Sequence, residues 1–214
     1  MTLPEIIPLF PLPNVVLFPR MPLPLHIFEP RYREMVRDAV RGARLVGMVL
    51  LRGEWQRDYG ARPEIFAIGT VGEIAHVEEL PDGRFNIVLR GLREYQIRQE
   101  LAPRALYREA AVHWRAIDRE PLPAGMRAEL GGLARRYLER LGRAPGEGAL
   151  LERGIDDETF VNFLAQHLDI DPLEKQGLLE SASLPERGRR LAEVLEFHLE
   201  TLRVAPGPAP TRTH

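Results

Sequence analysis

Cysteine is absent from the 214 residues of the chain. Its absence excludes disulfide bonds, thiolate metal ligands and thiol nucleophiles, so core packing alone has to hold the fold. Lysine and serine are nearly absent as well, since Lys175 is the only lysine and Ser181 and Ser183 are the only serines. A chain without cysteine suits a reducing compartment, and we therefore expect a cytoplasmic protein.

Long apolar runs are also missing. No segment approaches the roughly 18 uninterrupted apolar residues of a membrane helix. The N-terminal segment Met1–Phe18 has no cationic region ahead of its apolar positions, and four prolines interrupt it, which argues against a signal peptide. We expect no membrane association.

The charges nearly balance, with 29 basic and 31 acidic residues and a formal net charge of −2 at pH 7. Net charge therefore gives no reason to expect an anionic membrane or nucleic acid as a partner. With 44% hydrophobic and 28% charged residues, the composition is that of an ordinary globular protein. The length allows one or two domains.

Residues with catalytic or metal-binding chemistry do not gather into a motif. The six histidines are scattered, and none forms a His-x-x-x-His pair on one helical face. Glycine-rich phosphate-binding loops are absent, and a helix cap explains Ser183 better than a nucleophile does. The adjacent acids Glu78-Glu79 and Asp156-Asp157 would point apart in a strand or flank a helix start. The sequence predicts no catalytic residue, no metal ligand and no cofactor.

Residues 1–115 have the pattern of short β-strands. One helix is expected between Pro30, a favoured first helical residue, and a stop at Gly42. The expected strands are Ile6–Phe10, Val15–Phe18, Arg44–Leu51, Ala67–Leu80 with a bend or bulge, Arg84–Arg90 after a turn at Pro81-Asp82-Gly83, a segment with Tyr95 and Ile97 after a turn at Gly91, and Tyr107–Trp114. Such closely spaced strands favour a small closed or partly closed β-barrel over a parallel sheet.

Residues 116–203 have a helical period instead. Apolar stripes predict helices at Met126–Leu141 and around Phe160–Leu168. Two more helices are expected after Asp171 and Ser183, because each is followed by a proline in the first turn and an acid at the third position. The prediction is thus an α+β chain, with a mixed β-barrel at 1–115, a small helical bundle at 116–203 and a disordered tail at 204–214.

Two segments could bind a partner. Trp55 and Tyr59 lie in a polar, turn-rich segment and are residue types that interfaces favour, and the alternative is a loop whose aromatic side chains fold back onto the barrel. Phe18, Met21 and Leu23 alternate with prolines and could dock a peptide along an extended backbone, or could instead pack in the core at a barrel corner. These five residues are the candidate protein-binding residues.

Several longer stretches have a distinctive order along the chain. They are Ile7–Pro19, Leu23–Arg33, Gly69–Ile74, Leu80–Arg84, Gly91–Tyr95, and Glu174–Glu180 followed by Arg190-Leu191. Together they resemble the N-terminal substrate-recognition domain of Lon proteases over about residues 5–203. The resemblance implies a PUA-like barrel followed by a small helical bundle, which agrees with the periodicity.

The resemblance also implies a function. The ATPase module and the Ser-Lys protease module of a full Lon protease are not found in this chain, so the resemblance implies a stand-alone, non-catalytic module. Such a module would recognise unfolded or exposed polypeptide, or a partner protein, with a link to ATP-dependent proteolysis. PUA-like barrels of other families bind RNA, so an RNA-binding module is the alternative. Its site would be formed by Arg31, Arg33, Arg37, Arg41 and Arg44.

Overall fold

The computed structural model describes residues 3–58, 62–118, 120–143 and 154–204. The contacts divide the chain into two compact units, one made of Met1–Ile117 and Ala165–Glu180, the other of Asp118–Leu164 and Ser181–His214. This division differs from the single boundary expected after residue 115, because residues 165–180 group with the strands. Of the expected tail, Val204 is the last residue of a helix, and residues 205–214 lie outside the described residues.

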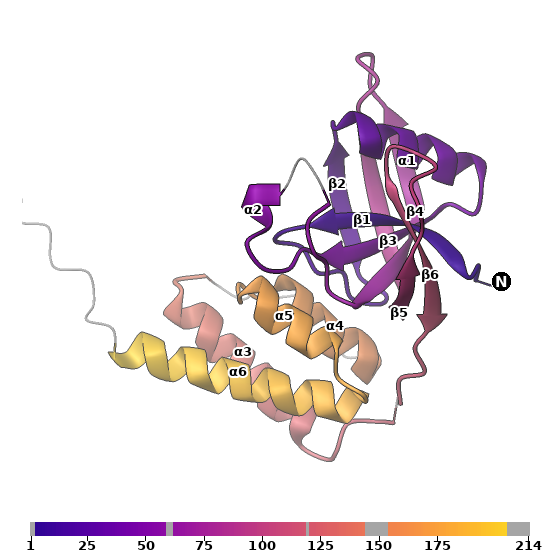
Figure 1. Ribbon diagram of the computed structural model, residues 1–214. Coiled ribbons are helices and arrows are strands. Elements are labelled where there is room, and N and C mark those ends of the chain that lie inside the picture. Colours follow the sequence, from indigo (N-terminus) through magenta and orange to yellow (C-terminus); the bar gives the residue numbers. More distant parts are fainter. Residues whose placement is uncertain (1–2, 59–61, 119, 144–153, 205–214) are drawn as a thin grey trace, which may run out of the picture. The chain divides into compact units, whose positions relative to one another are not determined.

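Among the described residues, the strands of the first unit form one mixed six-stranded sheet in the order β2-β5-β4-β3-β1-β6 (Figure 1). The strands are β1 Ile6–Leu12, β2 Pro22–Ile27, β3 Leu45–Leu50, β4 Ile68–Glu79, β5 Phe85–Glu100 and β6 Arg108–Trp114. Only β1 and β3 pair in parallel. Because β6 also pairs with the second half of β5, the pairings from β5 through β4, β3, β1 and β6 return to β5. The α+β class is therefore confirmed.

Two expectations about the strands are wrong. Val15–Phe18 is not a strand, and the amide of Phe18 donates to the side chain of Gln166 at 3.0 Å instead of joining a ladder. Gly91 does not turn the chain, because β5 continues through it, with a register shift in its pairing to β4 next to this residue. A Cβ at Gly91 would collide with the carbonyl oxygen of Phe18. This glycine therefore permits two backbone segments to approach closely, which is the other common reason for glycine in a strand.

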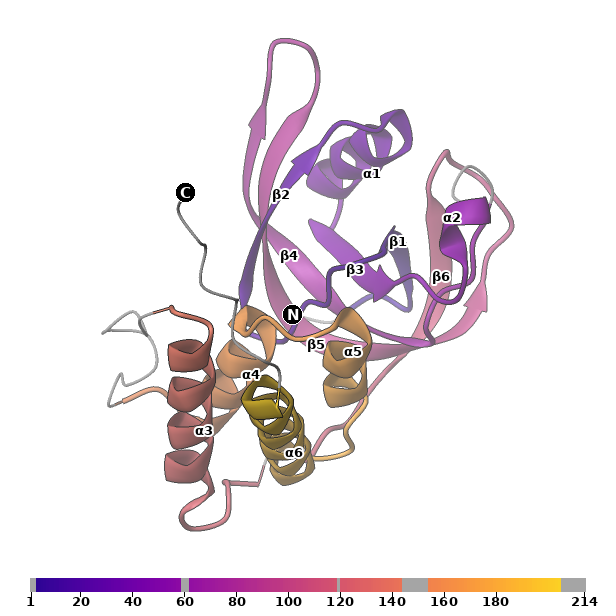
Figure 2. The same cartoon turned by 90° about the vertical axis from the view of Figure 1, so that its left-hand side faces the viewer.

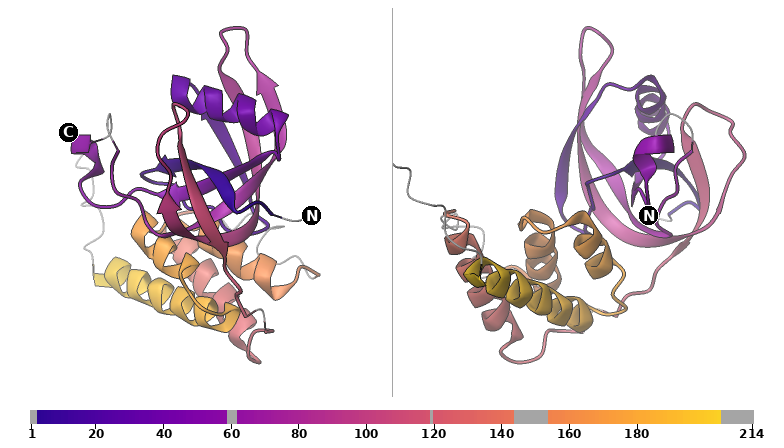
Figure 3. Two further views of the ribbon diagram at one scale, coloured as in Figure 1. Left: turned by 45° about the vertical axis from the view of Figure 1, so that its right-hand side comes forward. Right: turned by 60° about the vertical axis from the view of Figure 1, so that its left-hand side comes forward.

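Strands β4 and β5 form a long hairpin that projects beside α1, which spans Pro30–Arg41 (Figures 2 and 3). Register shifts between Val71 and Gly72 and between Ile74 and His76 confirm the bulge expected in this region. Helix α1 buries one apolar face against the sheet, as its three- and four-residue spacing predicts. The residues buried on that face are Tyr32, Met35, Val36 and Ala39.

Tyr95 lies at the centre of one part of the sheet core. Its side chain is fully buried, and its hydroxyl donates to the carbonyl oxygen of Met48 at 3.0 Å. Its ring meets that of Trp114 edge to face, with 6.4 Å between centroids. The buried residues packed with it are Ile7, Leu9, Leu45, Val71, Ala110 and Val112.

The burial of Tyr95 predicts a loss of stability at high pH. Desolvation raises the pKa of this hydroxyl well above its ordinary value of about 10. The unfolded chain therefore releases the Tyr95 proton first, and the stabilising contribution, complete below pH 10, is lost as the pH rises further. From pH 10 upward, the free energy of unfolding should fall more steeply in the wild type than in Tyr95→Phe, by about 1.4 kcal/mol per pH unit. Urea titrations of both proteins from pH 8 to 11.5 measure this difference, and parallel curves would contradict it.

The second unit is helical. Its helices are α3 Met126–Arg140, the first part of α4 Asp157–His167, and α6 Leu184–Val204. Helices α3 and α6 lie side by side and run in the same direction. A Cβ at Gly188 of α6 would be 2.9 Å from the Met126 sulfur, and His198 stacks edge to face on Tyr137. The expected cap of α6 is confirmed, since Ser183 Oγ accepts from the Glu186 amide at 3.2 Å.

Residues 165–180 contain the end of α4 and all of α5, which spans Pro172–Leu179. The capping box expected at Asp171 is present, because its carboxylate accepts from the Leu173 amide and Glu174 accepts from the Asp171 amide. Arg115 binds the other end of α5, donating to the carbonyl oxygens of Leu179 and Glu180 at 3.0 Å each. An arginine at this position satisfies carbonyls that lack an intrahelical partner.

Candidate functional site

The five candidate binding residues do not form one surface. Phe18 and Met21 are buried, with exposed fractions of 0% and 3%, so the core takes both side chains. Leu23 is half-buried on β2, and Trp55 is half-buried at the start of the one-turn helix α2, Trp55–Asp58. Tyr59 lies outside the described residues. A protein-binding role for Trp55 and Leu23 stays a prediction.

The arginines around α1 largely bond within the protein. Three of the five that the RNA alternative would use have internal partners, and a phosphate would have to compete with these bonds. The bonds join Arg31 Nη2 to Glu29 Oε2 at 2.8 Å, Arg37 Nη2 to Glu79 Oε1 at 3.3 Å, and Arg44 Nη2 to the Ile74 carbonyl oxygen at 2.9 Å. No observation on the described residues favours RNA binding over polypeptide binding.

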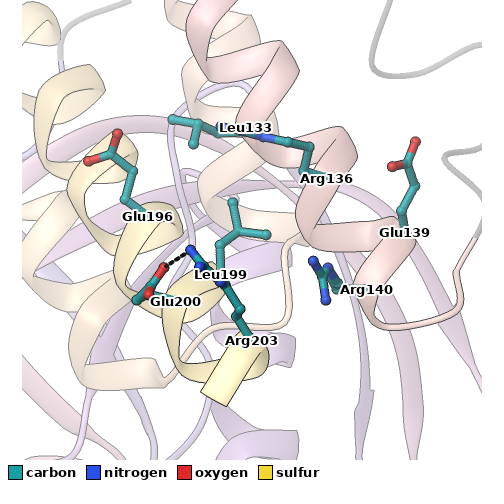
Figure 4. Close-up of a pocket in the computed structure, with 8 residues that line it drawn as sticks. All are labelled: Leu133, Arg136, Glu139, Arg140, Glu196, Leu199, Glu200 and Arg203. Carbon is teal, nitrogen blue, oxygen red and sulfur yellow. Dashed lines mark ion pairs between the residues drawn. The ribbon is translucent and has the colours of Figure 1, made fainter. Parts of the chain in front are cut away.

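A groove of about 810 Å³ runs between α3 and α6 in the helical unit (Figure 4). Leu133 and Leu199 form its apolar part, with charged side chains around them. The charged lining consists of Arg136, Glu139, Arg140, Glu196, Glu200 and Arg203, of which Arg203 and Glu200 form an ion pair at 3.6 Å. Three cations and three anions cancel, so this groove has no preference for a ligand of one sign.

A second groove, of about 340 Å³, lies between α1 and the β4–β5 hairpin in the sheet unit. It is lined by Arg37, Val40, Arg41, Val77, Glu79 and Phe85. Its apolar floor and its two arginines against one glutamate distinguish it from the α3–α6 groove. Sequence reasoning grouped Arg37 and Arg41 with the other arginines near α1. It missed the groove because Val77 and Phe85, on the β4–β5 hairpin, are far from α1 in the sequence.

The described residues contain no group of three or more histidine, aspartate or glutamate side chains that could hold a metal ion. Lys175, the only lysine, is half-buried, and its ammonium donates to the Gln166 carbonyl oxygen at 2.7 Å. Burial lowers the pKa of Lys175, although the nearby charge of Asp169 opposes that shift. The contact with Gln166 gives Lys175 a structural role at the end of α4.

Gln176, the next residue of the Glu174–Glu180 motif, also has a structural role. Only 2% of this residue is exposed, and its side-chain amide donates to the Ile68 carbonyl oxygen at 3.0 Å and to Glu180 Oε1 at 2.8 Å. One bond thus joins α5 to the start of β4, and the other joins α5 to its own C-terminus. A buried amide with two good bonds fixes the position of the helix on the sheet.

Gln176→Met should lower the free energy of unfolding by about 1–2 kcal/mol. Methionine is similar in length, so the loss comes from the two hydrogen bonds and from the Ile68 carbonyl left without its donor. Urea unfolding followed by tryptophan fluorescence measures the change, because both tryptophans, Trp55 and Trp114, belong to the sheet unit. Gln96→Met is the matched control, since Gln96 is exposed on β5 and should change stability by less than about 0.5 kcal/mol.

Comparison with known families identifies this combination of mixed sheet and helices. Residues 6–196 match the model of the ATP-dependent protease La (LON) substrate-binding domain. Because the match covers most of the chain, the chain belongs to this family. The resemblance inferred from the sequence motifs is therefore confirmed.

Relatives and solved structures agree with this assignment. The chain is 26% identical to a Lon protease of Flavobacterium johnsoniae and 30% identical to one of Roseiflexus castenholzii, covering 94% of this chain and 25% of each relative. It spans about a quarter of the length of the curated relatives it matches. A Lon N-terminal domain protein from Xanthomonas campestris is similar in structure, with a TM-score of 0.62, 25% identity, and coverage of 90% of this chain and 98% of that one.

The N-terminal domain of the Mycobacterium avium complex Lon protease has the same fold, with a TM-score of 0.66, 16% identity, and coverage of 91% of this chain and all of that one.

None of the helices in the described ranges combines the length and the apolar composition that crossing a bilayer requires.

Proposed function

We propose that this protein is a non-catalytic module that recognises exposed or unfolded polypeptide segments in the cytoplasm. The match of residues 6–196 to a substrate-binding domain carries the proposal. The described residues offer open grooves with apolar floors and charged rims, which suit a polypeptide that presents side chains of both kinds. A partner protein with an exposed segment would be bound by the same contacts.

A link to ATP-dependent proteolysis belongs to the same proposal. Its support is the similarity to Lon proteases, of whose length the chain spans a quarter. The module would supply recognition, and the ATPase and protease steps would be carried out elsewhere. The proposed function requires no catalytic side chain among the described residues.

A fluorescence-anisotropy titration against a labelled, permanently unfolded polypeptide tests the proposed function. Saturable binding that survives moderate salt and is not displaced by single-stranded RNA is expected. Salt-sensitive binding to RNA, with none to the polypeptide, would instead establish the nucleic-acid alternative. The same assay tests the predicted role of Trp55 as a binding residue. Trp55→Ala should weaken polypeptide binding, and unchanged binding would contradict that role.

A further inference from the structure

Helix α1 separates its charges onto two sides. Glu34 and Asp38 lie one turn apart, and they accept hydrogen bonds from the Leu106 amide at 3.4 Å and from the Tyr107 hydroxyl at 3.1 Å. The cations on this helix include a row at four-residue spacing, Arg33, Arg37 and Arg41, so these three share one face. That face is turned toward the β4–β5 hairpin, as the contacts of Arg33 and Arg37 with Gly83 establish.

The first two arginines of the row lie against the turn of the hairpin. A Cβ at Gly83, in the hairpin turn, would collide with the Arg33 guanidinium. Arg37 donates to the Gly83 carbonyl oxygen at 3.4 Å and to Glu79 at 3.3 Å, with its guanidinium 5.3 Å from the centroid of the Phe85 ring. Arg37 therefore bonds the turn of the hairpin to α1, whereas Arg33 packs against the turn with its buried Nε unpartnered.

The third arginine is the only exposed one of the three. Arg41 is exposed, and it makes no hydrogen bond or ion pair with any described residue. It lines the 340 Å³ groove together with Arg37, above a floor made of Val40, Val77 and Phe85. Phe85 is 96% buried, so this floor is firm, and the groove volume lies within the usual range of about 300–1,000 Å³ for ligand sites.

We propose that this groove binds a polypeptide segment in which an acidic residue follows a large apolar residue. The apolar side chain packs on Val40, Val77 and Phe85, and the carboxylate bonds to Arg41. The inference rests on the proposed function, which it deepens by naming the segment chosen. Charge complementarity carries it, because the lining has two cations and one anion, and Glu79 already bonds to Arg37.

A carboxylate beside an apolar group fits this groove better than a nucleic-acid backbone does. A phosphate chain needs several cations along its path, but Arg41 is the only exposed arginine of the row, and Arg37 is bonded to the hairpin. Glu79 would also repel a phosphate placed near Arg37. The apolar floor has no role in phosphate binding, whereas it supplies the main contact for a leucine or phenylalanine side chain.

The inference is tested by measuring the binding of two labelled Gly/Ser-rich peptides. They are identical except that one contains Phe-Asp and the other Phe-Asn. The wild type should bind the Phe-Asp peptide about two- to fivefold more tightly than the Phe-Asn peptide, the preference that an exposed ion pair provides. Arg41→Gln should abolish the preference. Arg41→Glu should reverse it toward a third peptide containing Phe-Lys. Arg98→Gln is the control, because Arg98 is also exposed without a described partner but lies on β5, outside the groove.

The outcomes separate the inference from the function it rests on. If the wild type binds unfolded polypeptide but shows no preference for Phe-Asp, or if Arg41→Gln keeps the preference, the groove assignment is overturned and the function stands. If no unfolded polypeptide binds, both fail. Loss of binding to single-stranded RNA in Arg41→Gln, without any change in peptide binding, also overturns the inference. Equal thermal unfolding temperatures of the variants and the wild type exclude misfolding as the cause.

Discussion

Gly69→Ala should lower the free energy of unfolding of the sheet unit by about 3 kcal/mol. A Cβ at Gly69 of β4 would collide with the carbonyl oxygen of Met48 and would lie 2.8 Å from Cζ of Tyr95. Neither neighbour can move cheaply. The Met48 carbonyl belongs to paired strand β3 and accepts the Tyr95 hydroxyl bond, and the Tyr95 ring is fully buried. The strands must separate locally, which strains both the pairing and the core.

Tryptophan fluorescence in urea measures this loss, since Trp114 packs on Tyr95. A loss of this size corresponds to a fall of about 6–12 °C in the unfolding temperature. Gly132→Ala in α3 is the matched control, because no atom beyond its chain neighbours and the nearby backbone of α3 itself lies within 4 Å of the added methyl group. In the interior of a helix that change should raise stability by about 0.5–1 kcal/mol. Equal stabilities of Gly69→Ala and the wild type would mean that β3, β4 and Tyr95 are not packed this closely.

Local signals in the sequence predicted local structure well. The caps at Asp171 and Ser183 depend on side chains within three residues of each helix start, so the sequence contains all the information that they need. The start of α1 at Pro30 and the bulge in β4 are of the same kind. Each of these features depends only on residues close to it in the sequence.

The features that the sequence did not reveal depend on residues far apart in the chain. Gly91 looks like a turn until the Phe18 carbonyl is known to lie against it. Residues 165–180 look like part of the helical half, yet hydrogen bonds of Gln166, Gln176 and Arg115 tie them to the sheet unit. A helical period predicts a helix and its apolar face, but it does not predict which body that face packs against.

The candidate site follows the same rule. The four-residue spacing of Arg33, Arg37 and Arg41 is visible in the sequence, and it predicts a shared helix face. What that face meets is set by the β4–β5 hairpin, whose turn lies about forty residues further along the chain. Conversely, Phe18 and Met21 have the residue types of a binding segment and are buried in the core. Residue type alone therefore does not separate a core residue from a surface anchor.

The helical unit contains a buried arginine whose loss should be as damaging as the change at Gly69. Arg187 of α6 is 1% exposed, and its Nη1 donates to Oδ1 of Asn162 at 2.6 Å. Asn162 is fully buried on α4, and Glu158, one turn earlier on the same helix, is 7% exposed. A cation placed among buried polar groups stabilises the fold only while its partners are present.

Arg187→Ala should lower the stability of the helical unit by about 3 kcal/mol, because it leaves a cavity and an Asn162 oxygen without its donor. Arg187→Met restores most of the volume but not the bond, so it should be intermediate. Far-UV circular dichroism in urea measures both losses, and tryptophan fluorescence should change less because both tryptophans lie in the sheet unit. If the Arg187→Met variant is as stable as the wild type, packing alone matters at this position. If Arg187→Ala and Arg187→Met are equally destabilising, the polar contacts of Arg187, including its hydrogen bond to Asn162, carry the energy.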